Sequence, residues 1–203
     1  MVAVIDYGLG NLGSIVNMLK ALGEKSVITG RAEEIKATDK IILPGVGAFD
    51  AGMRQLKERG LEEVIRKEAL AGKPVLGICL GMQLLGRRSE EGSLDGLGLI
   101  PFDNIRFRIA PESGLKIPHM GWDLIELKRT SPLTEGLKGP QRYYFVHSYH
   151  ARCDREENVL MTCEYGTEFA AAVVRGNIYG VQFHPEKSHH FGMALLENFV
   201  KRC

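Results

Sequence analysis

The chain of 203 residues carries 26 Lys and Arg against 25 Asp and Glu, a formal net charge of +1, with no long run of either sign. This balance argues against nucleic acid or an anionic membrane surface as a partner. Charged residues make up 25% and hydrophobic residues 44% of the chain. We therefore expect one domain over residues 1–203, with a core large enough to fold without disulfides or metals.

The cysteine pattern and the apolar segments suggest a compartment. Cys79, Cys153, Cys163 and Cys203 include no C-x-x-C pair, so the spacing indicates neither a zinc site nor a thioredoxin-like motif, and we expect no metal and no cofactor. Reduced thiols fit an intracellular protein. The first residues lack a basic leader, and no apolar stretch approaches 18 residues. We expect a soluble, cytoplasmic protein.

The first half of the chain predicts strands that alternate with amphipathic helices. Gly8, Gly10 and Gly13 match a dinucleotide fingerprint only superficially, and we interpret them as a permissive loop. The predicted strands are 2–6, a second one before residue 30, 40–43 and 75–78, and the predicted helices are 15–22, 51–56 and 61–70. Apolar strands joined by such crossovers predict a parallel sheet with helices on both faces.

After Leu97 the pattern changes to strands with few helices. The link Arg175-Gly176-Asn177 predicts a hairpin turn between the last two strands. An amphipathic helix with Leu195, Leu196 and Phe199 closes the chain. The predicted strands are 105–109, 122–127, 143–149, 159–164, 169–174 and 178–183. The whole chain therefore predicts an α/β fold, with a central, mostly parallel sheet and antiparallel C-terminal strands.

Cys79 is the candidate nucleophile. It follows the apolar strand 75–78 within Gly77-Ile78-Cys79-Leu80-Gly81, and a helical pattern comes next, as in a nucleophile elbow. Such a turn strains its central residue, and Gly77 and Gly81 remove Cβ atoms that would clash. A helix N-terminus beside the sulfur favours the thiolate. The alternative is a buried structural cysteine, which is our interpretation of the other three.

His184 and Glu186 are the candidate base and its orienting carboxylate. Pro185 favours an extended conformation at His184, and residues two apart then project to the same side. The carboxylate can hold one imidazole nitrogen while the other faces a thiol. The alternative is a solvent-exposed turn. The other histidines have no comparable carboxylate partner in the local sequence, and we expect packing or surface roles for His119, His150, His189 and His190.

Attack on an amide carbonyl creates an oxyanion that needs hydrogen-bond donors. The backbone N–H of Leu80, directly after the nucleophile, is one candidate. Val46 and Gly47, within Pro44-Gly45-Val46-Gly47 at the end of a predicted parallel strand, are others, because ligands in open α/β sheets bind at that edge. A tight turn without chemistry is the alternative for this segment.

These motifs resemble the class I, triad-type glutamine amidotransferases, which carry a Gly-x-Cys-x-Gly-x-Gln elbow and a late His-Pro-Glu. The resemblance covers nearly the whole chain and implies their flavodoxin-like, three-layer fold. Further segments look like the branch that serves as glutaminase subunit of imidazole glycerol phosphate synthase. They are Asp6-Tyr7-Gly8-x-Gly10-Asn11, Pro44 to Phe49, Pro118-His119-Met120-Gly121-Trp122 and His147-Ser148-Tyr149.

The resemblance implies that this chain hydrolyses L-glutamine and passes ammonia to a (β/α)₈ barrel cyclase in a heterodimer for histidine biosynthesis. Cys79 would form a γ-glutamyl thioester, His184 would relay protons, and Glu186 would orient His184. Val46 or Gly47, with Leu80, would stabilise the oxyanion. The residues implied to hold glutamine are Gly45, Gln83, Ser148 and Tyr149, and those implied to touch the barrel are Asn11, Trp122 and Lys187.

Asp123 departs from the family pattern, in which Asn more often follows Met-Gly-Trp. Three alternatives remain at this point: a glutaminase subunit of another synthase, a non-catalytic interaction module with this fold, and a stand-alone cysteine hydrolase of γ-glutamyl peptides. The intact Cys79, His184 and Glu186 argue against the second, and the segments around Asn11 and Trp122 argue against the first.

Overall fold

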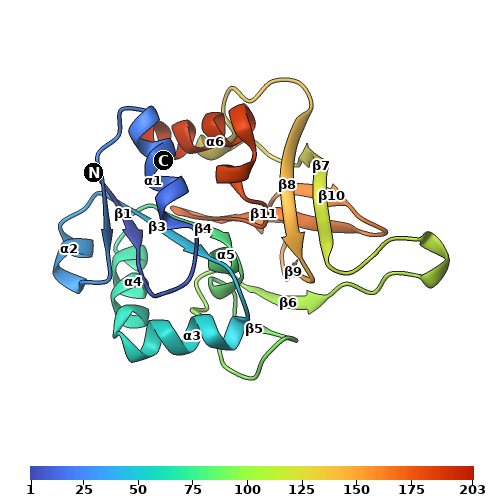
Figure 1. Cartoon of the computed structure of the whole chain (residues 1–203), viewed down its shortest axis with the longest axis horizontal. Coiled ribbons are helices and arrows are strands. Elements are labelled where there is room, and N and C mark those ends of the chain that lie inside the picture. The colour runs from blue at the N-terminus through green and yellow to red at the C-terminus, as the bar shows by residue number, and fades with distance from the viewer.

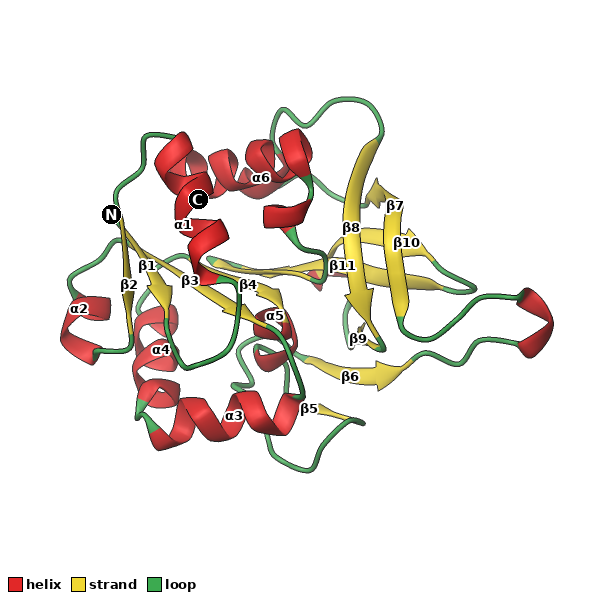
Figure 2. Cartoon of the chain, viewed as in Figure 1, coloured by secondary structure: helices red, strands yellow, loops and turns green.

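The computed structural model describes all residues from 1 to 203, and its first half alternates strands and helices (Figures 1 and 2). The strands β1, β2, β3 and β4 pair in parallel, as expected of crossovers through helices. The elements are β1 Val2–Ile5, α1 Leu12–Ala21, β2 Ser26–Thr29, α2 Ala32–Lys36, β3 Lys40–Gly45, α3 Phe49–Glu58, α4 Leu61–Leu70, β4 Val75–Cys79 and α5 Leu80–Leu84.

The second half is built mainly from antiparallel strands, with short 3₁₀ turns between them, of which η4 is Pro185–Lys187. In Figure 1 the ribbons of β7, β8 and β10 lie on the side of the molecule away from α2 and β2. The elements are β5 Arg88–Ser89, β6 Phe102–Arg106, β7 His119–Leu127, β8 Gln141–His147, β9 Tyr149–Cys153, β10 Val159–Glu164, β11 Glu168–Arg175, β12 Ile178–Val181 and α6 His189–Arg202.

One sheet joins the two halves, in the order β2-β1-β3-β4-β12-β11-β10-β7-β8, with β9 and β6 branching from β11. The strand that connects the two halves is β12, which runs parallel to β4 and antiparallel to β11. Its last residue, Val181, pairs with Ile78. The segment after β12 therefore emerges at the same sheet edge as Cys79, although more than 100 positions separate them in sequence.

Helices cover both faces of the parallel part of the sheet, which makes three layers (Figure 2). On one face α3 and α4 contribute buried residues such as Phe49 and Ile65, and Ala3 and Ile5 of β1 point toward them. On the other face α1 and α6 contribute residues such as Leu19 and Phe199. This confirms the predicted α/β fold class, because alternate residues of a strand are buried on opposite sides.

Several predicted boundaries were wrong. The helix α2 was not predicted, because five residues carry too little periodicity. The predicted strand 143–149 is two strands divided at Ser148, since β8 pairs with β7 whereas β9 pairs with β6 and β11. The strand placed at 105–109 is β6, which begins three residues earlier, and β3 continues through Pro44 and Gly45. The errors in the strands arise from pairing with distant segments.

No helix combines the length and the apolar character that crossing a bilayer requires. The structure also contains no cluster of three or more His, Cys, Asp and Glu side chains arranged to hold a metal ion.

Candidate active site

Cys79 lies at a sharp turn between β4 and α5. Its φ of 54° and ψ of −110° place a non-glycine residue in a conformation that L-amino acids rarely adopt. A Cβ at Gly77 would lie 2.6 Å from the Gly81 carbonyl oxygen, and a Cβ at Gly81 would overlap the Leu43 carbonyl. The turn thus excludes side chains at both flanking positions. Because α5 has only five residues, its dipole is weak, and the free N–H groups of its first turn are the larger influence.

His184 and Glu186 form a buried pair next to this turn. The His184 backbone N–H donates to the Tyr144 carbonyl at 2.9 Å, which fixes the extended segment after β12. The His184 Nδ1–H donates to Glu186 Oε1 at 2.8 Å, and the two side chains are 1% and 3% exposed. A carboxylate only accepts hydrogen bonds, so this contact sets the tautomer. Nε2 is left without a partner inside the chain.

The surroundings of His184 act on its pKa in opposite directions. Burial lowers the pKa, but the nearby Cys79 sulfur and the Glu186 carboxylate outweigh burial and raise it to about 9. A raised pKa favours the imidazolium form of His184.

The Cys79 sulfur and the His184 ring open into one pocket of about 280 Å³. Its walls come from the ends of β3, β4 and β8 and from the segment after β12, which is the edge of an α/β sheet where ligands bind. The lining residues are Val46, Gly47, Cys79, Leu80, Gln83, Glu91, Pro118, Val146, His147, Ser148, Tyr149 and His184. The candidate nucleophile and the candidate base therefore share one cavity, and Glu186 holds His184 by a hydrogen bond.

The sequence matches the family model "Glutamine amidotransferase class-I" over residues 3–203. The chain belongs to the class I glutamine amidotransferase family. Among curated relatives it is 51% identical to "Imidazole glycerol phosphate synthase subunit HisH 2" of Methanococcus maripaludis, over 100% of both chains. It is 48% identical to the protein of the same name in Pseudomonas aeruginosa, over 99% of each.

Solved structures agree on the fold. The "Structure of PurLQS from Thermotoga maritima" superposes with a TM-score of 0.76 at 21% identity, over 98% of this chain and 96% of the other. A structure described as "Crystal structure of glutamine amidotransferase" gives a TM-score of 0.73 at 22% identity, over 99% and 98%. The class I amidotransferase fold is thus shared with relatives of low sequence identity.

Most of the residues predicted to bind substrate line the pocket of this class I amidotransferase. Val46, Gly47, Leu80, Gln83, Ser148 and Tyr149 all do so, and Gly47 has a φ of 110°. Gly45 does not. It pairs with Cys79 in the sheet, and a Cβ there would collide with the Tyr7 hydroxyl and meet Leu80 at 3.0 Å. The absence of a side chain at Gly45 lets β3 pack against the elbow.

Two polar residues near the site were not predicted. Glu91 lines the pocket, and its Oε2 accepts the Phe49 backbone N–H at 2.8 Å, although it lies in an irregular loop without a motif. Gln182 is fully buried, and its Nε2 lies 3.9 Å from the Cys79 sulfur. Its Oε1 accepts Gln83 Nε2 at 3.1 Å. The signal in the sequence that could have identified Gln182 was its position two residues before the predicted base.

The residues expected to contact a partner lie near the end of the sheet that holds the pocket. Asn11 accepts the Ser14 N–H at 3.4 Å and so caps α1. Trp122 stacks on His189 with ring centroids 5.4 Å apart. The Lys187 ammonium lies 5.5 Å from the centroid of the Tyr144 ring. Each residue has an intramolecular role, and the exposed Lys187 follows Glu186 directly.

One prediction about histidine was wrong. His119 does have a carboxylate partner, because its Nε2 donates to Asp123 Oδ2 at 2.8 Å. Its Nδ1 also lies 3.1 Å from Nε2 of His147. Both rings are buried among aromatic side chains. Asp123 lies only four residues after His119 on β7, whereas the contact with His147 depends on the pairing of β7 with β8.

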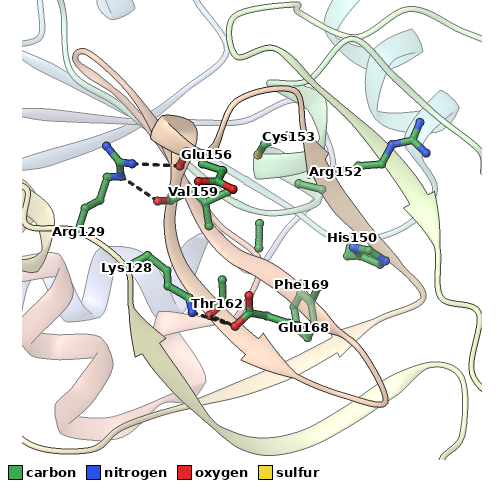
Figure 3. A pocket seen from close by; sticks show the side chains of 12 residues that line it. Lys128, Arg129, His150, Arg152, Cys153, Glu156, Val159, Thr162, Glu168 and Phe169 are labelled. Carbon is green, nitrogen blue, oxygen red and sulfur yellow. Dashed lines mark hydrogen bonds and ion pairs between the residues drawn. The ribbon is translucent and has the colours of Figure 1, made fainter.

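Figure 3 shows a larger cavity, of about 520 Å³, lined by residues of β9, β10 and β11. Two of its cationic side chains, Lys128 and Arg129, are engaged within the chain. Lys128 pairs with Glu168 at 2.9 Å, and Arg129 donates to the Val159 and Glu156 carbonyl oxygens at 3.2 Å. Burial raises the pKa of its thiol, Cys153, to about 12. This thiol therefore stays protonated at neutral pH.

Proposed function

We propose that this chain is the glutaminase subunit of an imidazole glycerol phosphate synthase, with Cys79, His184 and Glu186 as its catalytic residues. The observation that carries the proposal is the shared pocket of the Cys79 sulfur and the Glu186-oriented His184. Full-length identity of about half to subunits of that name supports the choice of synthase over other amidotransferases.

The reaction begins with attack of the Cys79 thiolate on the carboxamide carbon of glutamine, which forms a C–S bond and a tetrahedral oxyanion. His184 Nε2–H then gives its proton to the departing nitrogen, and ammonia leaves behind a γ-glutamyl thioester. The neutral His184 next takes a proton from water, whose oxygen attacks the thioester and releases glutamate. Glu186 keeps Nε2 directed at the reacting atoms throughout.

The backbone N–H of Leu80 and that of Val46 or Gly47 donate to the oxyanion. Leu80 N–H lies at the start of α5 directly after the nucleophile, and the residues of the 46–47 segment line the same pocket. The side chain of Val46 is 43% exposed. This exposure supports a segment that adopts its final geometry when another molecule covers it.

Gln83, Ser148 and Tyr149 hold the substrate, and Gly45 contributes by letting β3 lie close to the elbow. Glu91 is the carboxylate of the pocket lining and is the group that can pair with the α-ammonium of glutamine. The pocket therefore offers one anionic contact and several backbone groups, which suits a small zwitterion.

The partner is a (β/α)₈ cyclase that docks over the pocket, contacts Asn11, Trp122 and Lys187, and receives ammonia. Ammonia must travel in its neutral form, because protonation in bulk water removes the nucleophilic lone pair. The docking face is therefore the face on which the pocket opens. We further propose that residues 1–203 act as one domain in the cytoplasm, where the four free thiols stay reduced.

The test is glutamate release from glutamine by the purified chain, with and without a histidine-pathway barrel cyclase and its nucleotide ligand. We expect weak activity from the chain alone, strong stimulation by the liganded cyclase, and no activity from Cys79→Ala under either condition. Activity that needs Cys79 but ignores the cyclase would reject the assigned synthase. Activity that survives in Cys79→Ala would reject the mechanism.

A further inference from the structure

A chain of three hydrogen bonds connects an exposed carboxylate to the wall of the pocket. His119 Nε2 lies 2.8 Å from Asp123 Oδ2, His119 Nδ1 lies 3.1 Å from His147 Nε2, and His147 Nδ1 lies 2.8 Å from the Tyr149 carbonyl oxygen. His119 and His147 are directly opposite each other on β7 and β8. The Asp123 side chain is 41% exposed, whereas that of His119 is 1% exposed.

The protons of this chain do not balance if every group has its ordinary charge. Three hydrogen bonds require three protons. The Asp123 carboxylate and the Tyr149 carbonyl only accept, and two neutral imidazoles supply one N–H each. With those two protons used at the ends, two nitrogen lone pairs would face each other across the 3.1 Å between His119 and His147. The observed geometry therefore requires one additional proton.

The additional proton belongs at the end of the chain near Asp123. Burial lowers the pKa of His147 to about 3, so that ring stays neutral. Burial also lowers the pKa of His119, but the hydrogen bond and charge of Asp123 oppose it. The His119 ring is stacked against Tyr165 and Phe145, with centroids 4.0 and 4.8 Å away. Aromatic faces stabilise a cation.

We propose that Asp123, His119 and His147 are positioning residues that hold one shared proton and thereby fix the Ser148–Tyr149 wall of the pocket. His147 and Gln83, at 2.8 and 3.2 Å, both donate to the Tyr149 carbonyl. Loss of the shared proton removes the bond between the two imidazoles, so that the His147 ring is then held only by its bond to the Tyr149 carbonyl. That this wall binds glutamine rests on the proposed function.

The sign of the pH dependence follows from the proton count. The chain of three hydrogen bonds is complete at low pH, where His119 is an imidazolium. It loses its central bond as the pH rises through the pKa of His119. Burial lowers that pKa below the ordinary histidine value. The other titratable groups that face it come from β9, from β10, from the β10–β11 turn and from the segment after β12. They are His150, Cys163, Tyr165 and His184.

None of these four groups is hydrogen-bonded to Asp123, His119 or His147. Tyr165 donates its hydroxyl to the Lys116 carbonyl, and Cys163 lies toward the Glu164 carbonyl. His150 and His184 titrate separately and are distinguished by their own resonances. The extra proton is therefore a property of the three-residue chain.

Asp123→Asn is the matched variant, because it balances the protons without a charge. The amide Nδ2–H donates to His119 Nε2, His119 Nδ1–H donates to His147 Nε2, and His147 Nδ1–H still donates to Tyr149. This variant keeps three hydrogen bonds at every pH. We expect this variant to fold and to show no His119 titration.

The experiment is nuclear magnetic resonance of the full chain with labelled histidine and Asp side chains, from pH 5 to pH 9. In the native chain we expect His119 to carry protons on both nitrogens at low pH and to lose one as the pH rises. The Ser148 and Tyr149 backbone amides should shift with the same midpoint. In Asp123→Asn, neither the doubly protonated ring nor the shift of these amides should be present.

A native chain in which His119 holds a single ring proton beside an ionised Asp123 from pH 5 upward would overturn the proposal. An Asp123→Asn chain whose Ser148 and Tyr149 amides keep the native transition would also overturn it. In glutaminase assays with the cyclase, KM for glutamine should rise about threefold or more with pH in the native enzyme and stay flat in Asp123→Asn. The resonance measurements do not depend on activity, so they distinguish a failure of this proposal from a failure of the proposed function.

Discussion

The Gln182 side-chain amide lies with its nitrogen 3.9 Å from the Cys79 sulfur and its oxygen 3.1 Å from Gln83 Nε2. The contact joins the proposed nucleophile to a fully buried amide on the segment after β12. Sulfur is a weak acceptor, so the contact contributes orientation more than energy. It gives the sulfur a fixed direction at a turn where the backbone alone is strained.

Gln182→Leu should therefore impair catalysis more than substrate binding. We expect kcat to fall about tenfold with KM changed less than threefold, because the thiolate loses a donor that aligns it. Gln182→Glu is the companion variant, since it keeps the size but removes the N–H. Steady-state glutaminase kinetics and the rate of Cys79 alkylation by iodoacetamide measure the effect. Unchanged alkylation in both variants would show that the amide does not act on the sulfur.

The raised pKa of His184 predicts a pH-dependent contribution to stability. Its pKa in the folded chain is about 9, above the unfolded value of 6.5, so folding favours the protonated form. The contribution is complete below pH 6.5 and is lost as the pH rises through about 9. Its size is on the order of 3 kcal/mol, because each pKa unit corresponds to about 1.4 kcal/mol.

Urea unfolding of the native chain and of Glu186→Gln at pH 6 and pH 9 measures this contribution. The native free energy of unfolding should exceed that of Glu186→Gln by more at pH 6 than at pH 9, since the amide cannot stabilise an imidazolium. A difference between the two chains that stays constant with pH would contradict the assignment.

Gly81→Ala should destabilise the fold by roughly 3 kcal/mol or more, because its Cβ would overlap the Leu43 backbone carbonyl, which cannot move within the sheet. Gly13→Ala is the control. Gly13 lies in α1 with no atom within 4 Å of an added Cβ, and the change should stabilise the chain by about 0.5–1 kcal/mol. Chemical denaturation compares the two variants. Equal denaturation midpoints would show that a steric clash does not explain the glycine at position 81.

Trp122→Ala should weaken binding of the proposed cyclase about 10- to 100-fold, because a partly buried Trp beside the pocket has the character of an interface hot spot. Leu70→Ala is the control, since Leu70 is 73% exposed and ends α4, just before β4 and at the opposite end of that strand from Cys79. Calorimetric titration with the barrel subunit measures both dissociation constants. Equal affinities of the two variants would show that Trp122 does not contribute to the interface.

The elements that depend on local patterns could be predicted from sequence. Helix α4 and strand β10 have the predicted bounds, because the spacing of their apolar residues matches the periodicity of a helix or of a strand. The break at Ser148 could not be predicted, since 143–149 is uniformly strand-like and only the pairing of β8 and β9 with different partners divides it. The short α2 carries no periodicity that would reveal it.

At the candidate site, the residues proposed to react and the local geometry around them could be predicted from their spacing. The glycines around Cys79 and the His184-Pro185-Glu186 run restrict the backbone within a few residues, so their effect is readable from spacing alone. Only the tertiary structure decided that Gln182 contacts Cys79, that Glu91 reaches the pocket, and that His119 bonds both Asp123 and His147. The reason is physical. The contacts of Gln182 with Cys79 and of His119 with His147 depend on the pairing of β12 with β4 and of β7 with β8. Pairing between distant strands is set by the burial of the whole sheet.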